Sequence, residues 1–374
     1  MLNIRLIPWR NRGIFMKKFW YLSAPSLALA LAGCAGNSAS TDNAAPVTSN
    51  GTSTGTSTGN ASTSLTGAGA TFPAPLYSTW FDAYKAKAGV EINYQAVGSG
   101  TGIKQLANKT VDFGASDAPL GPKDKMPAPV ATIPTVGGAV VLAYNLPGAP
   151  ANLKMTGSAV ADIFLGKIKK WNDPALTALN PGVTLPDTAI TVAHRSDGSG
   201  TTSIFTNYLA AVSPTWKSSV GAGKSIDWPV GIGGKGNDGV AAGIKQAPGG
   251  LGYVELVYAK QNQLPYAALK NAAGQFVSPD VAGVIAAAES SLAAVQKDIT
   301  APIANASGAK AYPISSFTYL LVYKTAPNPG KGAAIKSFLK WAMTDGQKSA
   351  AAQDYAPLPP AIVALNQKTI DALK

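Results

Sequence analysis

The stretch ITVAHRSDGSGTTSIFTNYLAAV, residues 190–212, contains the two kinds of element that decide the fold. Its first residues predict a strand, and the small polar residues SDGSG, 196–200, predict a turn. The apolar side chains after the turn recur at the spacing of an amphipathic helix: Ile204, Phe205, Tyr208, Leu209 and Val212. A strand that leads through a short turn into a helix predicts α/β architecture.

The same succession of strand, small polar turn and helix occurs elsewhere in the chain. In VEINYQAVGSGTG, residues 90–102, apolar and polar side chains alternate as in a strand, and a helix is expected to follow. In TFPAPLYSTWFDAY, residues 71–84, Pro73 stands where a first helical residue belongs. The strongly apolar segments 137–146 and 317–324 are further strand candidates. We therefore expect an α/β fold.

Length, composition and charge limit the class of protein and its partners. A chain of 374 residues exceeds one typical domain, so we expect two lobes and a sizeable core. The formal net charge is +12, but residues 1–34 hold five basic and no acidic residues, which leaves 26 basic and 19 acidic residues in the remainder. This mild excess suits an anionic partner. No basic run or aromatic-interleaved basic stripe indicates nucleic acid, and we expect none as a partner.

The single cysteine and the single histidine exclude several kinds of site. One cysteine cannot form an internal disulfide or a thiolate cluster, and His194 alone cannot form the usual imidazole sites, so we expect no metal and no cofactor. Ser99 or Ser199 as a nucleophile would lack a general base other than His194, whose spacing from Ser199 gives no reason for contact. We therefore expect no enzyme.

The N-terminal 34 residues have the organisation of a lipoprotein-type signal peptide. A basic region begins at Met16, the expected start, and a short apolar stretch follows over residues 19–31. This stretch is too short for a membrane span. The sequence Leu-Ala-Gly-Cys ends it at Cys34 and resembles a bacterial lipoprotein signal, which implies cleavage before Cys34, lipidation of its thiol and anchoring to a membrane. Ordinary cleavage at a nearby small residue is the alternative.

Residues 35–64 have the composition of a flexible tether. Ser, Thr, Asn, Gly and Ala dominate the segment, and aliphatic side chains are nearly absent. Such a segment cannot bury enough apolar surface to offset the chain entropy lost on folding. We expect it to hold a folded body off a membrane.

Several uninterrupted blocks, in order along the chain, carry a family resemblance: LTGAGATFPAPLYSTW, VDFGASDAPL, LGKIKKWNDPAL, RSDGSGTT, GIGGKGNDGVAA, GYVELVYAKQN and DYAPLPP. They resemble the periplasmic phosphate-binding proteins, the substrate-binding proteins of the bacterial ABC phosphate importer. The resemblance implies a two-lobed periplasmic-binding-protein fold of type II, with mixed sheets flanked by helices and a hinge of crossing strands. By this similarity residues 65–144 and 313–374 form lobe 1, and residues 145–312 form lobe 2.

The same resemblance implies a set of phosphate ligands: Thr71, Phe72 through its N–H, Ser99, Asp117, Arg195, Ser199, Gly200 through its N–H, and Thr201. Asp197 would orient Arg195. The chain departs from the family nearby, at Thr101 and at His194, for which a solvent-facing position is expected; neither departure touches the ligand set. The implied function is high-affinity capture of inorganic phosphate by a monomer in the periplasm or cell envelope, with delivery to the membrane subunits of an ABC permease. The alternative is a phosphate-binding surface lipoprotein with a phosphomonoesterase-like side activity or with a sensing or adhesive role.

The chemistry of these residues is coherent apart from the resemblance. Hydroxyls, a guanidinium and main-chain N–H groups are donors that suit the oxygens of an anion. Asp117 is the exception, because a carboxylate repels an oxyanion unless the anion carries a proton. Phosphate near neutral pH has such a proton and sulfate has none, so Asp117 predicts discrimination between them. Taken singly, each small polar turn could be a helix cap, and the pair Arg195–Asp197 could be a surface ion pair.

Two glycine-rich stretches imitate nucleotide-binding loops. SSVGAGKS, residues 218–225, has Ser218 where the first glycine of a phosphate-binding loop belongs, and no helix can start after it. GIGGKG, residues 231–236, satisfies the spacing of a dinucleotide loop, but Pro229 interrupts the strand that must precede it. We expect neither stretch to bind a cofactor.

Overall fold

The computed structural model describes residues 64–374, all within one unit of the chain, Gly59–Lys374. The expected signal peptide, Cys34 and nearly all of the expected tether lie outside the described residues. In chain order, the strands are β1 (Ser64–Gly69), β2 (Glu91–Ala96), β3 (Phe113–Ser116), β4 (Val130–Asn145), β5 (Lys154–Met155), β6 (Thr191–Arg195), β7 (Ile232–Gly234), β8 (Gly250–Glu255), β9 (Ala268–Lys270), β10 (Phe276–Val277) and β11 (Ser315–Tyr323).

Helices lie between most of these strands, as α/β architecture requires. They are α1 (Ala74–Ala88), α2 (Ser99–Ala107), α3 (Gly157–Phe164), α4 (Pro174–Thr177), α5 (Gly200–Val212), α6 (Pro214–Ser219), α7 (Gly236–Gln246), α8 (Leu256–Gln261), α9 (Val281–Ser290), α10 (Leu292–Lys297), α11 (Pro329–Trp341), α12 (Gln347–Ala350) and α13 (Pro360–Asp371). A π-helical turn, Ala342–Gly346, and a 3₁₀ turn, Ala351–Gln353, flank α12. None of the helices within residues 64–374 is long and apolar enough to cross a membrane.

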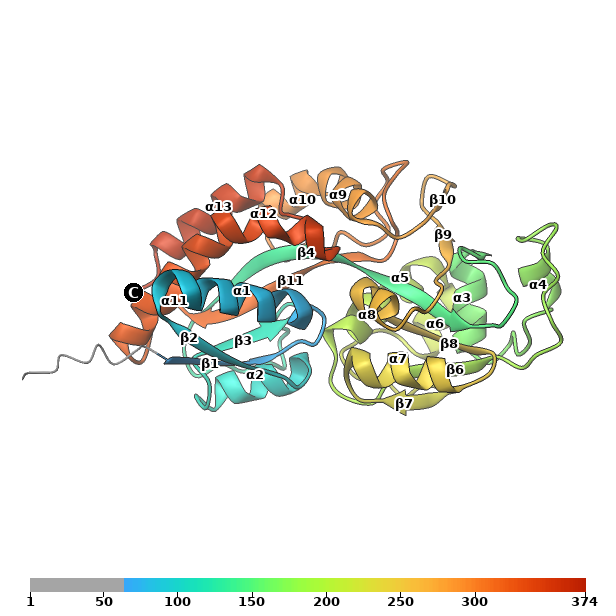
Figure 1. Ribbon diagram of the computed structural model, residues 1–374, viewed down its shortest axis with the longest axis horizontal. Helices are drawn as coiled ribbons and strands as arrows, with labels where there is room; N and C mark the ends of the chain where they lie inside the picture. Colours follow the sequence, from blue (N-terminus) through green and yellow to red (C-terminus); the bar gives the residue numbers. More distant parts are fainter. Residues whose placement is uncertain (1–63) are drawn as a thin grey trace, which may run out of the picture. The chain divides into compact units, whose positions relative to one another are not determined.

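One mixed sheet of eight strands organises the described chain, in the order β2-β1-β3-β11-β4-β8-β6-β7; a small second sheet holds β10-β9-β5. The long strand β4 pairs antiparallel with β11 through residues 130–139 and then with β8 through residues 140–145. It therefore belongs to two halves of the sheet, which Figure 1 shows on either side of β4. We call β2, β1, β3 and β11 the first half and β8, β6 and β7 the second half.

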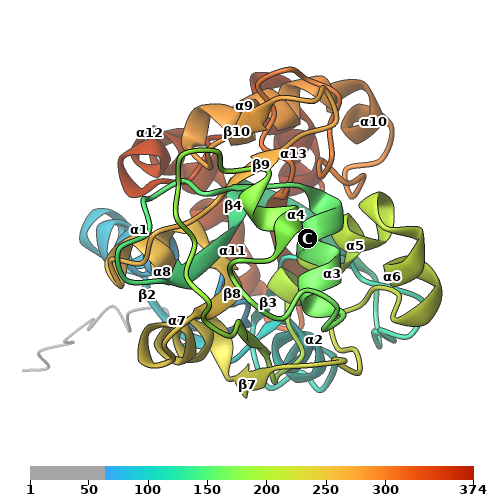
Figure 2. The ribbon, with the colours of Figure 1, turned by 90° about the vertical axis from the view of Figure 1, so that its right-hand side faces the viewer.

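The parallel strands of the second half place helices on both faces of the sheet. The strand β6 pairs in parallel with β8 on one side and with β7 on the other. The chain passes from β6 through α5 and α6 to β7, and returns through α7 to β8. Because both crossovers are right-handed by preference and run in opposite directions, their helices lie on opposite faces. Figure 2 shows α5 and α6 on one side of β8, and α7 and α8 on the other.

The opening stretch folds as its pattern predicts. Residues 191–195 form β6, and α5 begins at Gly200 with Ser199 as its N-cap. The Ser199 hydroxyl accepts a hydrogen bond from the Thr202 N–H at 3.0 Å, which satisfies one of the unpaired donors of the first helical turn. The local sequence therefore fixes both the strand and the start of the helix.

The first helix buries one face made of large apolar side chains. α1 starts at Ala74, one residue later than the pattern predicts, because Pro73 is the capping residue. Its buried side chains are Leu76, Tyr77, Trp80, Phe81 and Tyr84. The Phe81 ring packs 5.4 Å from that of Phe338 on α11, centroid to centroid. Burial of each large side chain contributes about 2 kcal/mol, which fixes α1 against the sheet and with it the loop after β1.

Candidate functional site

The ends of four strands bring the sequence-predicted residues together. Thr71 lies two residues beyond β1, Ser99 begins the helix after β2, Asp117 follows β3, and Arg195 ends β6. The carboxyl ends of parallel strands are where α/β sheets place their ligands. The exposed fractions of these four side chains are 3% or less. The site is therefore built from both halves of the sheet and is closed to solvent.

Ser99 connects Asp117 to the start of α5. Its Oγ accepts hydrogen bonds from the Gly200 N–H at 3.1 Å and from the Asp117 N–H at 3.4 Å. Both lone pairs of the Ser99 hydroxyl are directed at donors, so the hydroxyl proton is the part that Ser99 offers to other groups. Three of the predicted residues from three separate elements are thus in direct contact.

Gly200 allows this close approach because it has no side chain. A Cβ at Gly200 would lie 2.5 Å from Asp117 Oδ2 and 2.6 Å from Ser99 Oγ, closer than real Cβ contacts. A second close approach lies beside it, where the Gly100 N–H donates to the Gly198 carbonyl at 2.8 Å. The turns at the two halves of the sheet therefore meet through glycine backbone.

Arg195 is held by Asp197 in a bidentate ion pair. Arg195 Nε lies 2.7 Å from Asp197 Oδ1, and Arg195 Nη2 lies 2.6 Å from Asp197 Oδ2. The third edge of the guanidinium reaches Thr201, whose Oγ1 is 3.3 Å from Arg195 Nη1. Asp197 also accepts the Gly236 N–H at 3.1 Å. Arg195 is buried and Asp197 is mostly buried, so this is not a surface ion pair, and its fork geometry fixes where the guanidinium points.

The Asp197 carboxylate stays charged in this environment. Burial would raise the pKa of Asp197, but the hydrogen bond from Arg195 and its positive charge outweigh burial and hold the pKa below its ordinary value. Gly236 belongs to GIGGKG, and its N–H is used by Asp197. That glycine-rich loop therefore supports Arg195.

Asp117 is a buried acid in a different electrostatic state. Burial raises its pKa from 3.8 to about 7, although a hydrogen bond from Thr318 and the charge of Arg195 act in the opposite direction. Thr318 Oγ1 donates to Asp117 Oδ1 at 2.8 Å. The other carboxyl oxygen, Oδ2, faces Gly200. One oxygen is thus fixed by the protein, and the other faces the start of α5.

The loop Thr71-Phe72 is held by two tyrosines through its carbonyls. Tyr258 donates to the Thr71 carbonyl at 2.5 Å, and Tyr355 donates to the Phe72 carbonyl at 2.7 Å. The two hydroxyls fix the backbone of the loop, and the Thr71 hydroxyl contacts Asn237 at 2.8 Å. The Phe72 ring is fully buried in the core.

Four residues at the site were not predicted from the sequence: Thr318, Asn237, Tyr258 and Tyr355. Asn237 Nδ2 lies 2.8 Å from Thr71 Oγ1, and Asn237 is fully buried. It falls within the block GIGGKGNDGVAA. The glycine spacing is the recognisable motif of that block, and it gives no signal for Asn237. Thr318 lies in an apolar strand sequence that contains no signal of a site.

His194 faces solvent less than the sequence predicted. Its ring is half-buried and stacks on Trp228 with 4.8 Å between ring centroids. Burial lowers its pKa below the ordinary value, and its Nδ1 lies 3.1 Å from the Arg195 carbonyl. Alternation along β6 directs His194 and Arg195 to opposite faces of the strand, so the histidine packs away from the site.

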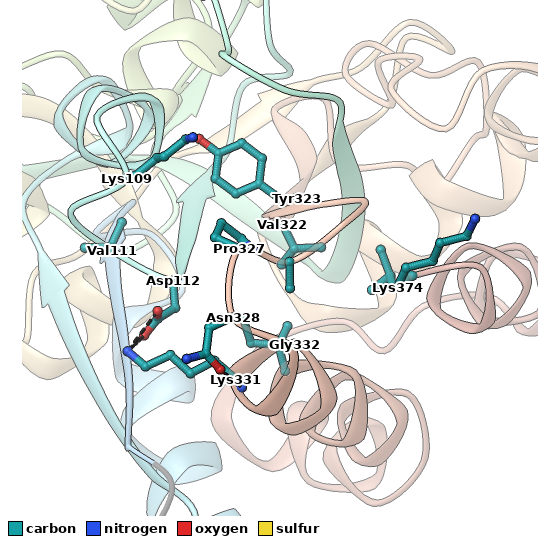
Figure 3. Close-up of a pocket in the computed structure, with 13 residues that line it drawn as sticks. Lys109, Val111, Asp112, Val322, Tyr323, Pro327, Asn328, Lys331, Gly332 and Lys374 are labelled. Carbon is teal, nitrogen blue, oxygen red and sulfur yellow. Dashed lines mark hydrogen bonds and ion pairs between the residues drawn. The ribbon is translucent and has the colours of Figure 1, made fainter.

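Two cavities differ in their relation to these residues. One, of about 340 Å³, reaches Asp117 and lies between the exposed side of α5 and β11, with Ser203, Asn207 and Tyr319 in its wall. The other, of about 100 Å³, is the cavity of Figure 3 beside α11, and it contains none of the predicted residues. Its Lys331 Nζ is already paired with Asp112 at 2.8 Å. We therefore place the candidate site at the strand ends around Asp117.

The donors of the site suit an anion better than a cation. Within residues 64–374, no group of three or more His, Cys, Asp or Glu side chains is arranged to hold a metal ion. The groups that the site offers to a ligand are hydroxyl protons, backbone N–H groups and one guanidinium. They surround Asp117, an acid with a raised pKa.

Comparison with known proteins gives a consistent result. A family model described as a PBP superfamily domain matches residues 51–346. The chain is 44% identical over 337 residues to the phosphate-binding protein PstS of Xylella fastidiosa (strain 9a5c). The aligned residues cover 90% of this chain and 93% of the relative. It is 46% identical over 301 residues to the phosphate-binding protein PstS of Haemophilus influenzae, and there the aligned residues cover 80% of this chain and 90% of the relative.

Solved structures share the fold at lower identity. The high affinity periplasmic phosphate-binding protein PfluDING, bound with phosphate at pH 8.5, has a TM-score of 0.65 at 22% identity over 82% of this chain and 93% of its own. The phosphate-binding protein from Stenotrophomonas maltophilia has a TM-score of 0.63 at 21% identity, with the same coverage of both chains. The two-lobed α/β fold expected from the sequence is therefore confirmed. By its sequence relatives and its fold, the chain belongs to the PBP superfamily and, within it, to the family of phosphate-binding proteins PstS.

Proposed function

We propose that this protein captures inorganic phosphate between the two halves of its sheet and delivers it to an ABC-type phosphate permease. The observation that carries the proposal is the meeting of Ser99, Asp117 and the Gly200 N–H at one buried point, beside a guanidinium fixed by Asp197. The proposed ligands are the eight residues predicted from the sequence: Thr71, Phe72, Ser99, Asp117, Arg195, Ser199, Gly200 and Thr201. Charge-assisted hydrogen bonds from such donors are about twice as strong as neutral ones.

Asp117 supports phosphate as the ligand rather than a fully ionised oxyanion. In its charged form, a carboxylate oxygen can accept the P–OH of hydrogen phosphate, while every other group in the set donates. Sulfate has no proton to offer, so its oxygens would face the Asp117 lone pairs in a buried site. A site built around such a required hydrogen bond rejects an analogue that lacks it by about 10⁴–10⁵-fold.

Closure of two lobes on the ion is the proposed mechanism, with residues 65–144 and 313–374 as lobe 1 and residues 145–312 as lobe 2. Contacts between these parts support it, because they place backbone and side chains of both against each other: Gly100 with Gly198, Asn237 with Thr71, and Lys224 with Asp124. A ligand that binds both lobes shifts the population toward the closed form. A dissociation constant near 1 µM would correspond to about −8 kcal/mol.

The proposed place of action is the periplasm or cell envelope. The signal-like residues 1–34 support export, the Leu-Ala-Gly-Cys sequence supports a lipid on Cys34, and residues 35–64 would tether the body to the membrane. We propose that the protein acts as a monomer in contact with the membrane subunits of the permease, with no catalytic role. The stacking of His194 on Trp228 supports this, because it directs the only imidazole away from Ser199.

Isothermal titration of the purified protein with phosphate, arsenate and sulfate tests the proposal. We expect tight binding of phosphate and no heat from sulfate at the same concentration. Absence of phosphate binding would contradict the proposed function. A chromogenic phosphate ester separates the enzymatic alternative, because sustained release of product, lost in an Arg195→Ala variant, would show turnover.

A further inference from the structure

Asn237 occupies the contact between the two halves of the sheet. It is the second residue of α7, and its side chain is fully buried. Its Nδ2 donates to Thr71 Oγ1 at 2.8 Å, in the loop after β1, and lies 3.3 Å from Thr201 Oγ1 in the first turn of α5. One amide therefore contacts two of the proposed phosphate ligands, one from each half.

The orientation of the Asn237 amide is fixed by a third contact. Its Oδ1 accepts the Glu255 N–H at 3.0 Å. A backbone N–H can only donate, so the group facing Glu255 must be the oxygen, and the group facing the two threonines must be the NH₂. Asn237 is thus a donor toward both hydroxyls.

This arrangement leaves each hydroxyl with its proton as the free group. Thr71 Oγ1 also faces the Asn237 backbone N–H, at 3.3 Å, and Thr201 Oγ1 also faces Arg195 Nη1, at 3.3 Å. A hydroxyl has two lone pairs and one proton, and here both lone pairs of each oxygen are directed at donors. Within residues 64–374 the structure gives neither threonine proton an acceptor, so both are available to an anion.

We infer that Asn237 is a positioning residue that turns the hydroxyl protons of Thr71 and Thr201 toward the bound anion. The inference rests on the proposed function and deepens it, because it explains how two groups that can donate or accept are made to donate only. Without Asn237, either hydroxyl could rotate and present a lone pair to a phosphate oxygen. Because Asn237 bonds to Thr71 across the halves, it also favours the arrangement in which both threonines reach the same ion.

A double-mutant cycle on the full chain tests this inference, with phosphate as the titrant in calorimetry. We expect Asn237→Ala to weaken phosphate binding about 10-fold, the effect of losing one to two oriented hydrogen bonds. In a Thr71→Val background the same change should weaken binding only about 3-fold, because one of the two hydroxyls that Asn237 orients is gone. Asn237→Asp should weaken binding about 100-fold or more, because a carboxylate attracts the threonine protons and repels the anion. Where calorimetry is too insensitive, the rise in melting temperature with millimolar phosphate gives the affinity.

Asn180→Ala is the matched control. Asn180 is a buried residue between α4 and β6. Its amide makes three hydrogen bonds, to Lys154 N and O and to the Leu176 carbonyl, and contacts none of the proposed ligands. We expect it to lower the melting temperature and to leave phosphate affinity within about twofold. The inference is overturned if Asn237→Ala leaves affinity unchanged, or weakens it equally with and without the Thr71 hydroxyl. If the unaltered protein binds no phosphate, the proposed function fails instead.

Discussion

Thr318 Oγ1 donates a hydrogen bond to Asp117 Oδ1 at 2.8 Å, across 201 residues of sequence. The bond joins β11 to the end of β3, two antiparallel neighbours in the first half of the sheet. It fixes one carboxyl oxygen, so the other, Oδ2, is directed at the start of α5. The orientation of the proposed proton acceptor is therefore set by a strand that carries none of the proposed ligands.

Thr318→Val should raise the pKa of Asp117 above its value of about 7. The hydroxyl stabilises the charged carboxylate, and valine keeps the shape of threonine without the donor. Titration of the ligand-free protein, followed by carbon NMR of labelled aspartate carboxyls, measures the shift directly. An unchanged or lowered pKa would show that the hydrogen bond does not stabilise the charged form.

Asp117→Asn should relax the discrimination between phosphate and sulfate. The amide can offer N–H to a sulfate oxygen, so the repulsion between two sets of lone pairs disappears. We expect sulfate, which the unaltered protein rejects, to bind with an affinity within about 100-fold of that for phosphate. Competition calorimetry with both anions gives the ratio. Continued exclusion of sulfate would mean that selectivity arises from another feature of the site.

The same substitution should stabilise the ligand-free protein at high pH. The folded pKa of Asp117 is about 7 against 3.8 for the free side chain, so the folded state holds the extra proton and loses stability as the pH rises through this window. The loss is at most on the order of 4 kcal/mol, and asparagine has no proton to lose. Urea unfolding in phosphate-free buffer should show Asp117→Asn gaining stability relative to the unaltered protein at pH 8 compared with pH 4. An equal difference at the two pH values would contradict this account.

Local patterns predicted the helix starts of the site, only the family resemblance joined Thr71, Ser99, Asp117 and Arg195, and neither signalled the supporting contacts of Thr318 and Asn237. Ser199, Gly200 and Thr201 follow from a cap and a helical repeat that lie within a dozen residues of one another. Thr318 and Asn237 are brought to the site by strand pairing and by α7, and nothing next to them in the sequence signals that contact. His194 shows the same limit, because its partner Trp228 is 34 residues away and decides that the ring is stacked rather than exposed.

Gly200→Ala should weaken phosphate binding strongly. Its Cβ would overlap Asp117 Oδ2 and Ser99 Oγ, so the start of α5 would have to move away from both. We expect affinity to fall by about 100-fold or more, which is the loss of two or more charge-assisted hydrogen bonds. Gly243→Ala in α7 is the control, since its Cβ would meet only ordinary contacts at 3.8 Å. It should leave binding unchanged and gain up to about 1 kcal/mol of helix stability.

Glu255→Gln should stabilise the ligand-free protein at pH 8 relative to pH 5. Glu255 is fully buried, and within residues 64–374 its Oε1 has no hydrogen-bond partner. The other oxygen, Oε2, accepts the Val257 N–H at 2.9 Å and faces the Tyr355 hydroxyl at 3.3 Å, and that hydroxyl shares its one proton with the nearer Phe72 carbonyl at 2.7 Å. Burial also raises the pKa of Glu255 well above 4.5, and stability is therefore lost as the pH rises above 4.5.

Glutamine cannot ionise, and any cost of fitting its amide is the same at both pH values, so the difference between pH 5 and pH 8 isolates the charge on Glu255. Urea unfolding of both proteins at the two pH values measures it. A variant that loses stability equally at both pH values would show that the folded protein does not raise the pKa of Glu255.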